Sequence, residues 1–230
     1  MDGQTAVITG ASRGIGKAVA EAFASAGAHV VICARNGDRI EEAADAIREA
    51  GGSATVSRAD VRDEFDVERL MERAAEIGGD IDYVVANAGI YHGTAGKTSL
   101  GTESYAAFDD HLRTNARGVF ATLSEAVPHL SNDARLLVPS GVVARNTSPG
   151  YGSYAVSKAA AEAIVRGFAA DTDYDVCVVD PGQVATDLTG GEGHDPDDAA
   201  EQFRWVARDA PADLFDGGVV DRKTWREHVS

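Results

Sequence analysis

The sequence predicts an α/β fold in which a parallel sheet of six or seven strands is doubly wound, with helices on both faces. The first observation is that runs of valine, isoleucine and leucine, four to six residues long, recur along the chain. Such near-continuous apolar runs are typical of strands that are buried on both faces. The second observation is that these runs alternate with longer amphipathic segments, and strands that alternate with helices form parallel sheets with right-handed crossovers. Because no linker-like stretch or internal repeat divides the 230 residues, we expect a single domain over residues 1–230.

The first half of the chain indicates four strands and three helices. Short apolar runs predict strands at residues 5–9, 28–34, 53–59 and 81–89. Amphipathic segments between them predict helices at residues 16–27, 37–52 and 64–79. Gly27 would close the first of these helices at its C-cap position, and Asp38 is the candidate N-cap of the second.

The second half continues the alternation and then changes character. Apolar runs predict the fifth and sixth strands at residues 134–140 and 174–182, and the two long helices expected here cover about residues 103–130 and 152–170. After Pro181 the chain becomes polar and contains many glycines. We expect residues from about 186 to 230 to form a substrate loop, one helix over residues 196–210 and a last strand or tail of the same domain.

The charge balance excludes several classes of partner. Thirty-seven acidic residues against 21 basic ones give a formal net charge of −16, which repels nucleic acids and anionic membranes. No apolar run approaches the roughly 18 residues that span a bilayer, and the first strand begins too close to Met1 to leave room for a signal peptide. We therefore expect a cytoplasmic protein.

The acidic balance also resembles that of proteins from salt-rich cytoplasms. At 1 M salt a Debye length of about 3 Å screens the repulsion between surface charges. The sequence therefore favours a halophilic protein, although an ordinary acidic mesophilic protein is the alternative. Cys33 and Cys177 lie within apolar runs and in no metal-binding spacing, so we expect free buried thiols and no metal site.

A glycine-rich segment, TGASRGIG, lies where the first strand meets the first helix. Its glycines, at positions 10, 14 and 16, let the backbone turn sharply and approach a ligand closely. The helix that follows offers unpaired N–H groups to a phosphate. A tight turn without a ligand is the alternative, but the position after the first strand favours a phosphate-binding loop.

A second motif, SYAVSK, places Tyr154 and Lys158 one helical turn apart on the same face of a helix. A phenol has an ordinary pKa of about 10, and a nearby positive charge favours the phenolate. We expect Lys158 to lower the pKa of Tyr154, so that the phenol can exchange a proton with a substrate oxygen. The alternative is a surface pair in which the lysine extends into solvent.

Taken together, the motifs resemble those of the short-chain dehydrogenase/reductase family. The similarity runs in order from Thr5 to about Leu188 and consists of TGxxxGxG at 9–16, ANAG at 86–89, Asn115, Ser140, YxxxK at 154–158 and PG at 181–182. The resemblance implies a Rossmann-type domain and an NAD(P)-dependent oxidoreductase that interconverts a carbonyl compound and a secondary alcohol.

The resemblance also implies which residues contact the dinucleotide. The glycine loop would hold the pyrophosphate, the residues after the third strand the adenine ring, those after the fourth strand the ribose side, and those after the sixth strand the nicotinamide amide. In that order, the implied contacts are Gly10, Ser12, Arg13, Gly14, Ile15 and Gly16; Asp60 and Val61; Asn87, Ala88 and Gly89; and Pro181, Gly182, Val184 and Thr186. The alternative interpretation of Asn87 is that its side chain chiefly stabilises the sheet.

The choice between NADP and NAD depends on the end of the second strand. NAD-dependent relatives usually place an acidic residue there to accept from the ribose hydroxyls. Here Ala34 takes that position, Arg35 follows it, and Arg13 lies in the glycine loop. Two guanidiniums without a carboxylate suit a 2′-phosphate, so NADP is the favoured cofactor and NAD the alternative.

Four residues match the catalytic positions of the family. Tyr154 would be the general acid or base, Lys158 would bind the nicotinamide ribose, Ser140 would hold the substrate oxygen, and Asn115 would anchor a water for proton relay. Ser140 precedes Tyr154 by fourteen positions (154 − 140), one more than is common in the family. We therefore expect a one-residue insertion within 142–148, with Ser148 and Ser153 as weaker alternatives to Ser140.

The substrate and the assembly are less defined. We expect a medium-sized ketone, aldehyde, keto-ester or secondary alcohol. Tyr91 and His92 are candidates to face this substrate, and packing within their own loop is the alternative. We also expect a homodimer or homotetramer formed through the two long helices. A non-catalytic NADP(H)-binding regulator is the alternative function, and an isomerase or dehydratase on the same scaffold is a third.

Overall fold

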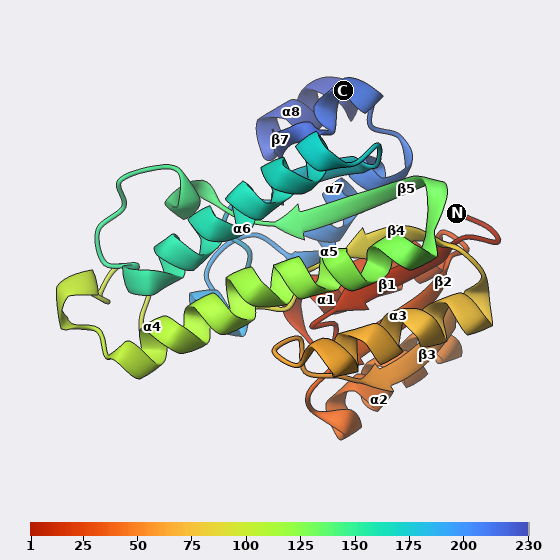
Figure 1. Cartoon of the computed structure of the whole chain (residues 1–230), viewed down its shortest axis with the longest axis horizontal. Coiled ribbons are helices and arrows are strands. Elements are labelled where there is room, and N and C mark those ends of the chain that lie inside the picture. Colours follow the sequence, from red (N-terminus) through yellow and green to blue (C-terminus); the bar gives the residue numbers. More distant parts are fainter. Residues whose placement is uncertain (230) are drawn as a thin grey trace.

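Seven parallel strands form one sheet in the computed structural model, which describes residues 1–229 (Figure 1). The strand order is β3-β2-β1-β4-β5-β6-β7. The strands are β1 (Thr5–Thr9), β2 (His29–Ala34), β3 (Ser53–Arg58), β4 (Ile81–Val85), β5 (Leu130–Pro139), β6 (Asp175–Asp180) and β7 (Asp216–Asp221). The chain winds outward from β1 in one direction and from β4 in the other, which confirms the predicted doubly wound fold. Ligands of such sheets bind outside the carboxyl ends of the strands at the point where the order reverses, here between β1 and β4.

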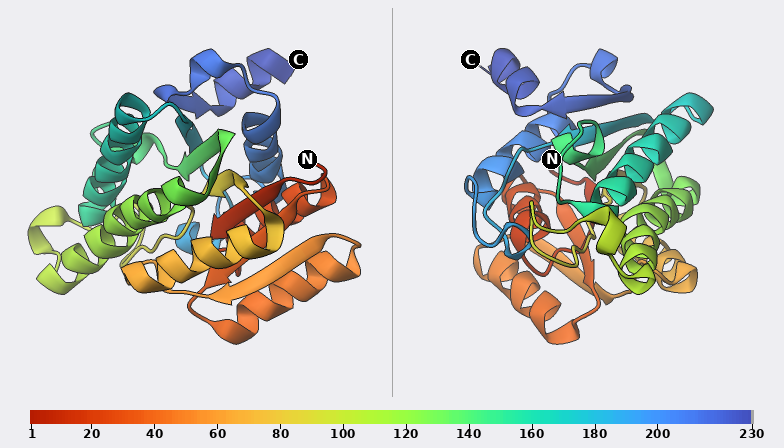
Figure 2. Two further views of the ribbon diagram at one scale, coloured as in Figure 1. Left: turned by 45° about the vertical axis from the view of Figure 1, so that its right-hand side comes forward. Right: turned by 90° about the vertical axis from the view of Figure 1, so that its left-hand side faces the viewer.

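Helices cover both faces of the sheet (Figure 2). One face carries α1 (Gly14–Ser25), α2 (Gly37–Glu49) and α7 (Pro196–Arg208), and the other carries α3 (Glu64–Gly78), α5 (Gly118–Ala126) and α6 (Gly152–Asp171). The short helix α4 (Tyr105–His111) precedes α5, and α8 (Arg222–Val229) follows β7 at the edge of the sheet. None of the helices within residues 1–229 is both long enough and apolar enough to cross a membrane.

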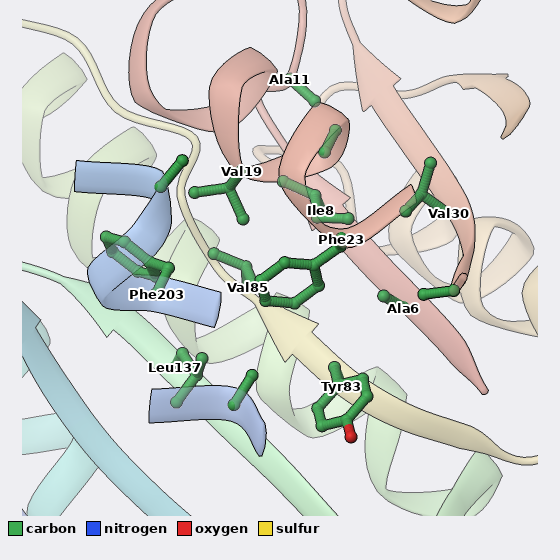
Figure 3. Close-up of a cluster of buried hydrophobic side chains, with 14 of the residues drawn as sticks. Ala6, Ile8, Ala11, Val19, Phe23, Val30, Tyr83, Val85, Leu137 and Phe203 are labelled. Atoms are coloured by element: carbon green, nitrogen blue, oxygen red, sulfur yellow. The ribbon is translucent and has the colours of Figure 1, made fainter. Parts of the chain in front are cut away.

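Alternate side chains of the central strands enter two separate apolar cores. Ile8 of β1 packs with Phe23 of α1 and Phe203 of α7 in the core shown in Figure 3. Its neighbour Val7 enters the opposite core, which also contains Leu70 of α3. All five residues of β1 are buried, which is why the sequence shows a continuous apolar run rather than an alternating one.

The long helix expected over residues 103–130 is interrupted. After α4 the chain forms a wider π-helical segment, Leu112–Arg117, before α5 begins, and β5 starts at Leu130, four residues earlier than expected. Asn115 lies in the π-helical segment and exchanges two hydrogen bonds with the backbone of Ile90, at 2.8 and 2.9 Å. This side chain therefore connects the distorted turn to the segment after β4. Such π-bulges occur often at functional sites.

Two smaller expectations also need correction. The N-cap of α2 is Asn36 rather than Asp38, because the Asn36 Oδ1 accepts from the backbone N–H of Arg39 at 3.0 Å. The C-terminal region contains the expected helix and last strand and, in addition, α8.

Candidate active site

A cleft of about 750 Å³ opens at the carboxyl ends of the strands, where the order of the sheet reverses. Its walls come from the glycine-rich turn after β1 and from the segments after β2, β3, β4 and β6. The predicted cofactor residues that line it are Gly10, Ser12, Arg13, Gly14, Ile15, Gly16, Arg35, Asp60, Val61, Asn87, Ala88, Gly89 and Thr186. The structure therefore brings together residues that are up to 176 positions apart (186 − 10) in the sequence.

The glycine-rich turn needs its glycines for two physical reasons. Gly10 and Gly14 have φ angles of +68° and +56°, a region that side chains other than glycine rarely adopt. A Cβ on Gly16 would lie 2.3 Å from Asn87 Nδ2 and 2.6 Å from the Gly10 carbonyl oxygen. Asn87 Nδ2 itself donates to the carbonyl oxygens of Thr9 and Gly10, at 2.9 and 3.2 Å. Asn87 thus braces the turn against β4, as its second interpretation allowed.

Three guanidiniums line the cleft. Arg13 and Arg35 are those expected from the sequence, and Arg39 in the first turn of α2 is a third that the sequence analysis missed. The signal available in the sequence was a second arginine four positions after Arg35, at the start of the following helix. Arg13 also forms an ion pair with Asp187, which lines the cleft as well. No acidic side chain stands at the end of β2, where Ala34 lines the cleft.

Asp60 occupies the expected place after β3, but its carboxylate already has a partner. The Arg62 guanidinium donates to both carboxylate oxygens of Asp60, at 2.7 to 3.0 Å, and also reaches Asp110 at 3.1 Å. Burial acts to raise the pKa of Asp60, but the hydrogen bonds from Arg62 outweigh it and hold that pKa below its usual value. Asp60 is therefore a carboxylate at neutral pH, fixed in place by Arg62.

Tyr154 lies in the first turn of α6 with its ring against other aromatic side chains. Its ring centroid is 4.8 Å from that of Tyr91 and 6.2 Å from that of His111. Within residues 1–229 its hydroxyl has no hydrogen-bond partner. Burial raises the pKa of Tyr154 to about 12, with smaller contributions from Tyr91 and Tyr151.

Lys158 follows one turn later and has a different partner from the one expected. Its Nζ donates to the carbonyl oxygen of Pro139 at 2.6 Å. Burial lowers the pKa of Lys158 to about 8, whereas the carboxylates of Glu162 and Asp180 act to raise it. The expected lowering of the Tyr154 pKa by Lys158 is therefore wrong for this structure, because burial dominates at the phenol and the ammonium points to Pro139.

Ser140 stands at the end of β5, directly after the residue that Lys158 contacts. Its backbone N–H donates to the carbonyl oxygen of Val179, and its side-chain oxygen is buried without a partner among the described residues. The alternative Ser153 differs, since its side chain contacts His111 and its N–H donates to Glu103. Of these two serines, Ser140 is the one with an unused hydroxyl. A short 3-10 turn, Val142–Ala144, lies in the segment where the extra residue was expected.

Asn115 is fully enclosed behind the cleft. Besides its two bonds with Ile90, its Nδ2 donates to the Ser157 hydroxyl at 3.0 Å. Ser157 lies between Tyr154 and Lys158 on α6 and donates to the Tyr154 carbonyl oxygen at 2.7 Å. Asn115 therefore ties the segment after β4 to the helix that carries Tyr154 and Lys158.

The remaining predicted residues lie outside the lining of the cleft. Tyr154, Lys158, Pro181, Gly182 and Val184 are not among the described residues that form its walls. The segment after β6 is held by a bond from the Gly182 N–H to the Asp180 carboxylate at 3.0 Å. Val184 is buried. Only Thr186 of that predicted segment reaches the cleft.

Comparison with known proteins agrees with this geometry. The family model described as short chain dehydrogenase matches residues 4–197. The chain belongs to the short chain dehydrogenase family. It is 36% identical to a versicolorin reductase of Emericella nidulans over 193 residues, which are 82% of this chain and 72% of that protein. A glycine betaine reductase of the same fungus is 34% identical over 195 residues, 83% of this chain but only 15% of that protein.

A solved structure of a relative shows that the similarity extends over the whole fold. An alcohol dehydrogenase from Thermococcus sibiricus, complexed with 5-hydroxy-NADP, has a TM-score of 0.85 at 32% identity, and the match covers 95% of each chain. Since the family is that of short chain dehydrogenases, the protein is an oxidoreductase that acts on CH–OH or C=O groups.

This short chain dehydrogenase contains two buried clusters of ionisable residues that the sequence analysis missed. In the first, Arg145 forms ion pairs with Glu162 and Asp180, whose side chains are 3% and 4% exposed. These two carboxylates are the ones that raise the pKa of Lys158. In the second, Glu103 and His111 are buried at the start of α6. Neither cluster follows a motif, because its members come from different elements of the fold.

Proposed function

We propose that this enzyme is an NADP(H)-dependent oxidoreductase that interconverts a carbonyl compound and a secondary alcohol, with Tyr154 as the general acid or base. The observation that carries the proposal is a pair of hydroxyl groups, on Ser140 and Tyr154, without partners among the described residues. Buried hydroxyls usually have hydrogen-bond partners, so the buried Ser140 hydroxyl without one suits a ligand oxygen. The bond from Lys158 to Pro139 supports the pairing, since it holds the Tyr154 helix against the residue before Ser140.

The residues of the cleft fit a nicotinamide dinucleotide. A Cβ at Gly10 would lie 2.7 Å from Ala88 Cα, and one at Gly16 would lie 2.3 Å from Asn87 Nδ2, so only glycine lets the turn pack this closely against the segment after β4. The turn leads directly into the N-terminus of α1, whose first N–H groups suit a phosphate. Arg13, Arg35 and Arg39 offer positive charge beside Ala34, which suits the 2′-phosphate of NADP better than the bare hydroxyl of NAD. The crystallised relative with 5-hydroxy-NADP supports the same choice. When bound, the dinucleotide supplies the hydride acceptor or donor.

In this mechanism the protein supplies orientation and a proton. Ser140 would donate its hydroxyl proton in a hydrogen bond to the substrate oxygen and hold that oxygen in line with Tyr154. A phenol with a pKa of about 12 is fully protonated at neutral pH, so Tyr154 is prepared to act as an acid in carbonyl reduction. Lys158, with a pKa of about 8, is mostly cationic at neutral pH and would stabilise negative charge that forms on the phenol.

The proposed substrate is a medium-sized carbonyl compound. Tyr91 and Tyr151 lie near Tyr154, with the Tyr91 ring 4.8 Å from the Tyr154 ring and 6.5 Å from the Tyr151 ring. Aromatic surroundings favour a substrate with a flat apolar part. The similarity to a versicolorin reductase supports the inclusion of cyclic aromatic ketones among the substrates to test.

Two measurements test the proposal. Fluorescence titration with NADPH and NADH should show tighter binding of NADPH, and a panel of aldehydes, keto-esters and aromatic ketones should oxidise NADPH, in low and in molar salt. Tyr154→Phe should abolish turnover while NADPH still binds, whereas Tyr105→Phe, at a residue that is 90% exposed, should leave turnover unchanged. Full activity in Tyr154→Phe would remove the proton-transfer role. Tight NADPH binding without oxidation of any carbonyl would favour a regulatory role instead.

We also propose that two copies pair through α5 and α6. Phe120 of α5 is 50% exposed and its ring lies 6.1 Å from that of Phe168 in α6, so the two helices present an aromatic surface. An exposed aromatic residue of this size is typical of an interface. Light scattering on the purified chain should give at least twice the mass of 24.0 kDa, and Phe120→Asp should lower that mass. A monomer at micromolar concentration would contradict this pairing.

A further inference from the structure

A buried polar cluster lies at the start of the helix that carries Tyr154. Its members are Glu103, His111 and Ser153. His111 is the last residue of α4, and α4 lies beside the start of α6 (Figure 1). The Glu103 side chain is 5% exposed and that of His111 is fully buried. The Glu103 Oε2 accepts from the Ser153 N–H at 2.6 Å, while its Oε1 lies 3.5 Å from His111 Nδ1 and makes no hydrogen bond to a described residue. A carboxylate at this end of a helix is favoured by the helix dipole.

The hydrogen bonds of His111 define which of its ring nitrogens carries the proton. The backbone N–H of His92 donates to His111 Nε2 at 2.8 Å, so Nε2 is an acceptor and the neutral ring carries its proton on Nδ1. From Nδ1 the ring can donate to the Ser153 hydroxyl, 2.7 Å away. His111 thus joins two segments, the loop after β4 on one side and the first turn of α6 on the other.

The loop that His111 holds carries the aromatic residue nearest to Tyr154. The Tyr91 ring lies 5.8 Å from the His111 ring and 4.8 Å from the Tyr154 ring. Its hydroxyl contacts the Thr98 side chain at 3.1 Å and the Gly150 carbonyl oxygen at 3.2 Å, so the same loop is also joined to the turn before α6. Tyr91 therefore forms a fixed wall of the Tyr154 environment, and it is fixed partly through His111.

We propose that His111 and Glu103 are positioning residues of the reaction: they fix the first turn of α6, and with it Tyr154, against the loop that carries Tyr91. This inference rests on the proposed function of Tyr154. A cluster with these bonds restrains both segments at once, because His111 contacts the His92 N–H and the Ser153 hydroxyl while Glu103 accepts from the Ser153 N–H. This role explains why a histidine and a glutamate occupy the protein interior, where apolar residues would pack at a lower free-energy cost.

The ionisation of His111 adds a pH dependence to the same arrangement. Burial lowers the pKa of His111; Glu103 and Asp110 act to raise it, and His92 acts to lower it further. The other titratable groups packed against the ring are the phenols of Tyr91 and Tyr154. A proton on Nε2 would remove the acceptor of the His92 N–H and bring two donors together. Turnover should therefore decline as the pH falls into the range where His111 is protonated.

The test compares His111→Asn and Glu103→Gln with a matched control, His129→Asn, whose histidine lies in the turn before β5. Asparagine can replace the donor at Nδ1 but not the acceptor at Nε2, and glutamine keeps an acceptor for Ser153 without the charge. Amide hydrogen exchange is measured on peptides that cover residues 88–98 and 150–158. In parallel, the Kd for NADPH, the KM for the carbonyl, kcat and the pH profile of kcat/KM are measured.

The expected result is roughly tenfold faster exchange of both peptides in His111→Asn, and a roughly tenfold lower kcat/KM that no longer declines at acid pH. Glu103→Gln should accelerate exchange of the 150–158 peptide most. The Kd for NADPH should change less than about twofold in both, because neither residue lines the cleft. The control should match the parent protein throughout.

Unchanged exchange in both variants would overturn the proposal, whatever happens to turnover. So would faster exchange with the parent kcat/KM and pH profile, because the cluster would then be structural only. If the parent protein reduces no carbonyl at all, the proposed function fails, and the exchange measurement by itself still decides whether the cluster fixes the two segments.

Discussion

Replacement of Arg145 by methionine tests how much this guanidinium stabilises the fold by pairing with the two buried carboxylates near Lys158. Arg145 donates to Glu162 at 2.5 Å and also pairs with Asp180. Its own side chain is 30% exposed, whereas the two carboxylates are almost completely buried. Arg145→Met keeps most of the apolar volume of the side chain and removes the charge. It leaves Glu162 without a hydrogen-bond partner among the described residues, while Asp180 keeps the Gly182 N–H at 3.0 Å.

The size of the effect follows from these contacts. Removal of one partner from a buried ion pair costs about 3–5 kcal/mol, because the other charge remains buried and unpaired. Arg145 is partly exposed and Asp180 keeps one partner, so we expect the free energy of unfolding to decrease by the lower end of this range, about 3 kcal/mol. For a chain of this size about 1 kcal/mol corresponds to roughly 2–4 °C, so Tm should fall by about 6–12 °C.

The assay is urea unfolding and calorimetry at one fixed salt concentration. Arg48→Met is the matched control, because Arg48 also pairs with two carboxylates, Glu41 and Asp45, but on the exposed face of α2. Exposed pairs contribute about 0–1 kcal/mol, so the control should change stability by about 1 kcal/mol or less. Equal losses in Arg145→Met and Arg48→Met would refute the reasoning. In the double variant with Glu162→Gln, the loss should be smaller than the sum of the two single losses.

Three further predictions concern the cleft and the response to pH. Arg35→Asp should shift the preference from NADPH toward NADH, and an unchanged ratio of the two Kd values would show that Arg35 is only a surface charge. Gly16→Ala should weaken NADPH binding at least tenfold and lower stability by about 1–3 kcal/mol, because the added Cβ would lie 2.3 Å from Asn87 Nδ2; normal binding would mean that the turn can relax. Burial lowers the pKa values of His29 and His111 from 6.5, so both histidines bind protons more readily in the unfolded chain. The contribution of these two histidines to the free energy of unfolding should therefore be complete above about pH 6.5 and decrease as the pH falls below that value. Equal free energies of unfolding at about pH 7.5 and 5.5 would contradict this direction.

The sequence determined those parts of the protein that depend on local patterns. Continuous apolar runs specify strands buried on both faces, and their alternation with amphipathic segments specifies a parallel sheet. The glycine-rich turn was readable because only glycine tolerates the φ angles and close contacts that it requires. The four-residue spacing of Tyr154 and Lys158 likewise placed both on one helix.

Only the tertiary structure determined the electrostatics around these residues. The bonds of Arg145 to its carboxylates join positions 17 and 35 residues apart, and those of Ser153 to His111 and Glu103 join positions 42 and 50 apart. The local sequence pattern contains no information about such long-range contacts. The pKa values of Tyr154 and Lys158 moved in directions that motif spacing did not indicate, because the loss of water around a buried group is a property of the packed fold rather than of its neighbours in sequence.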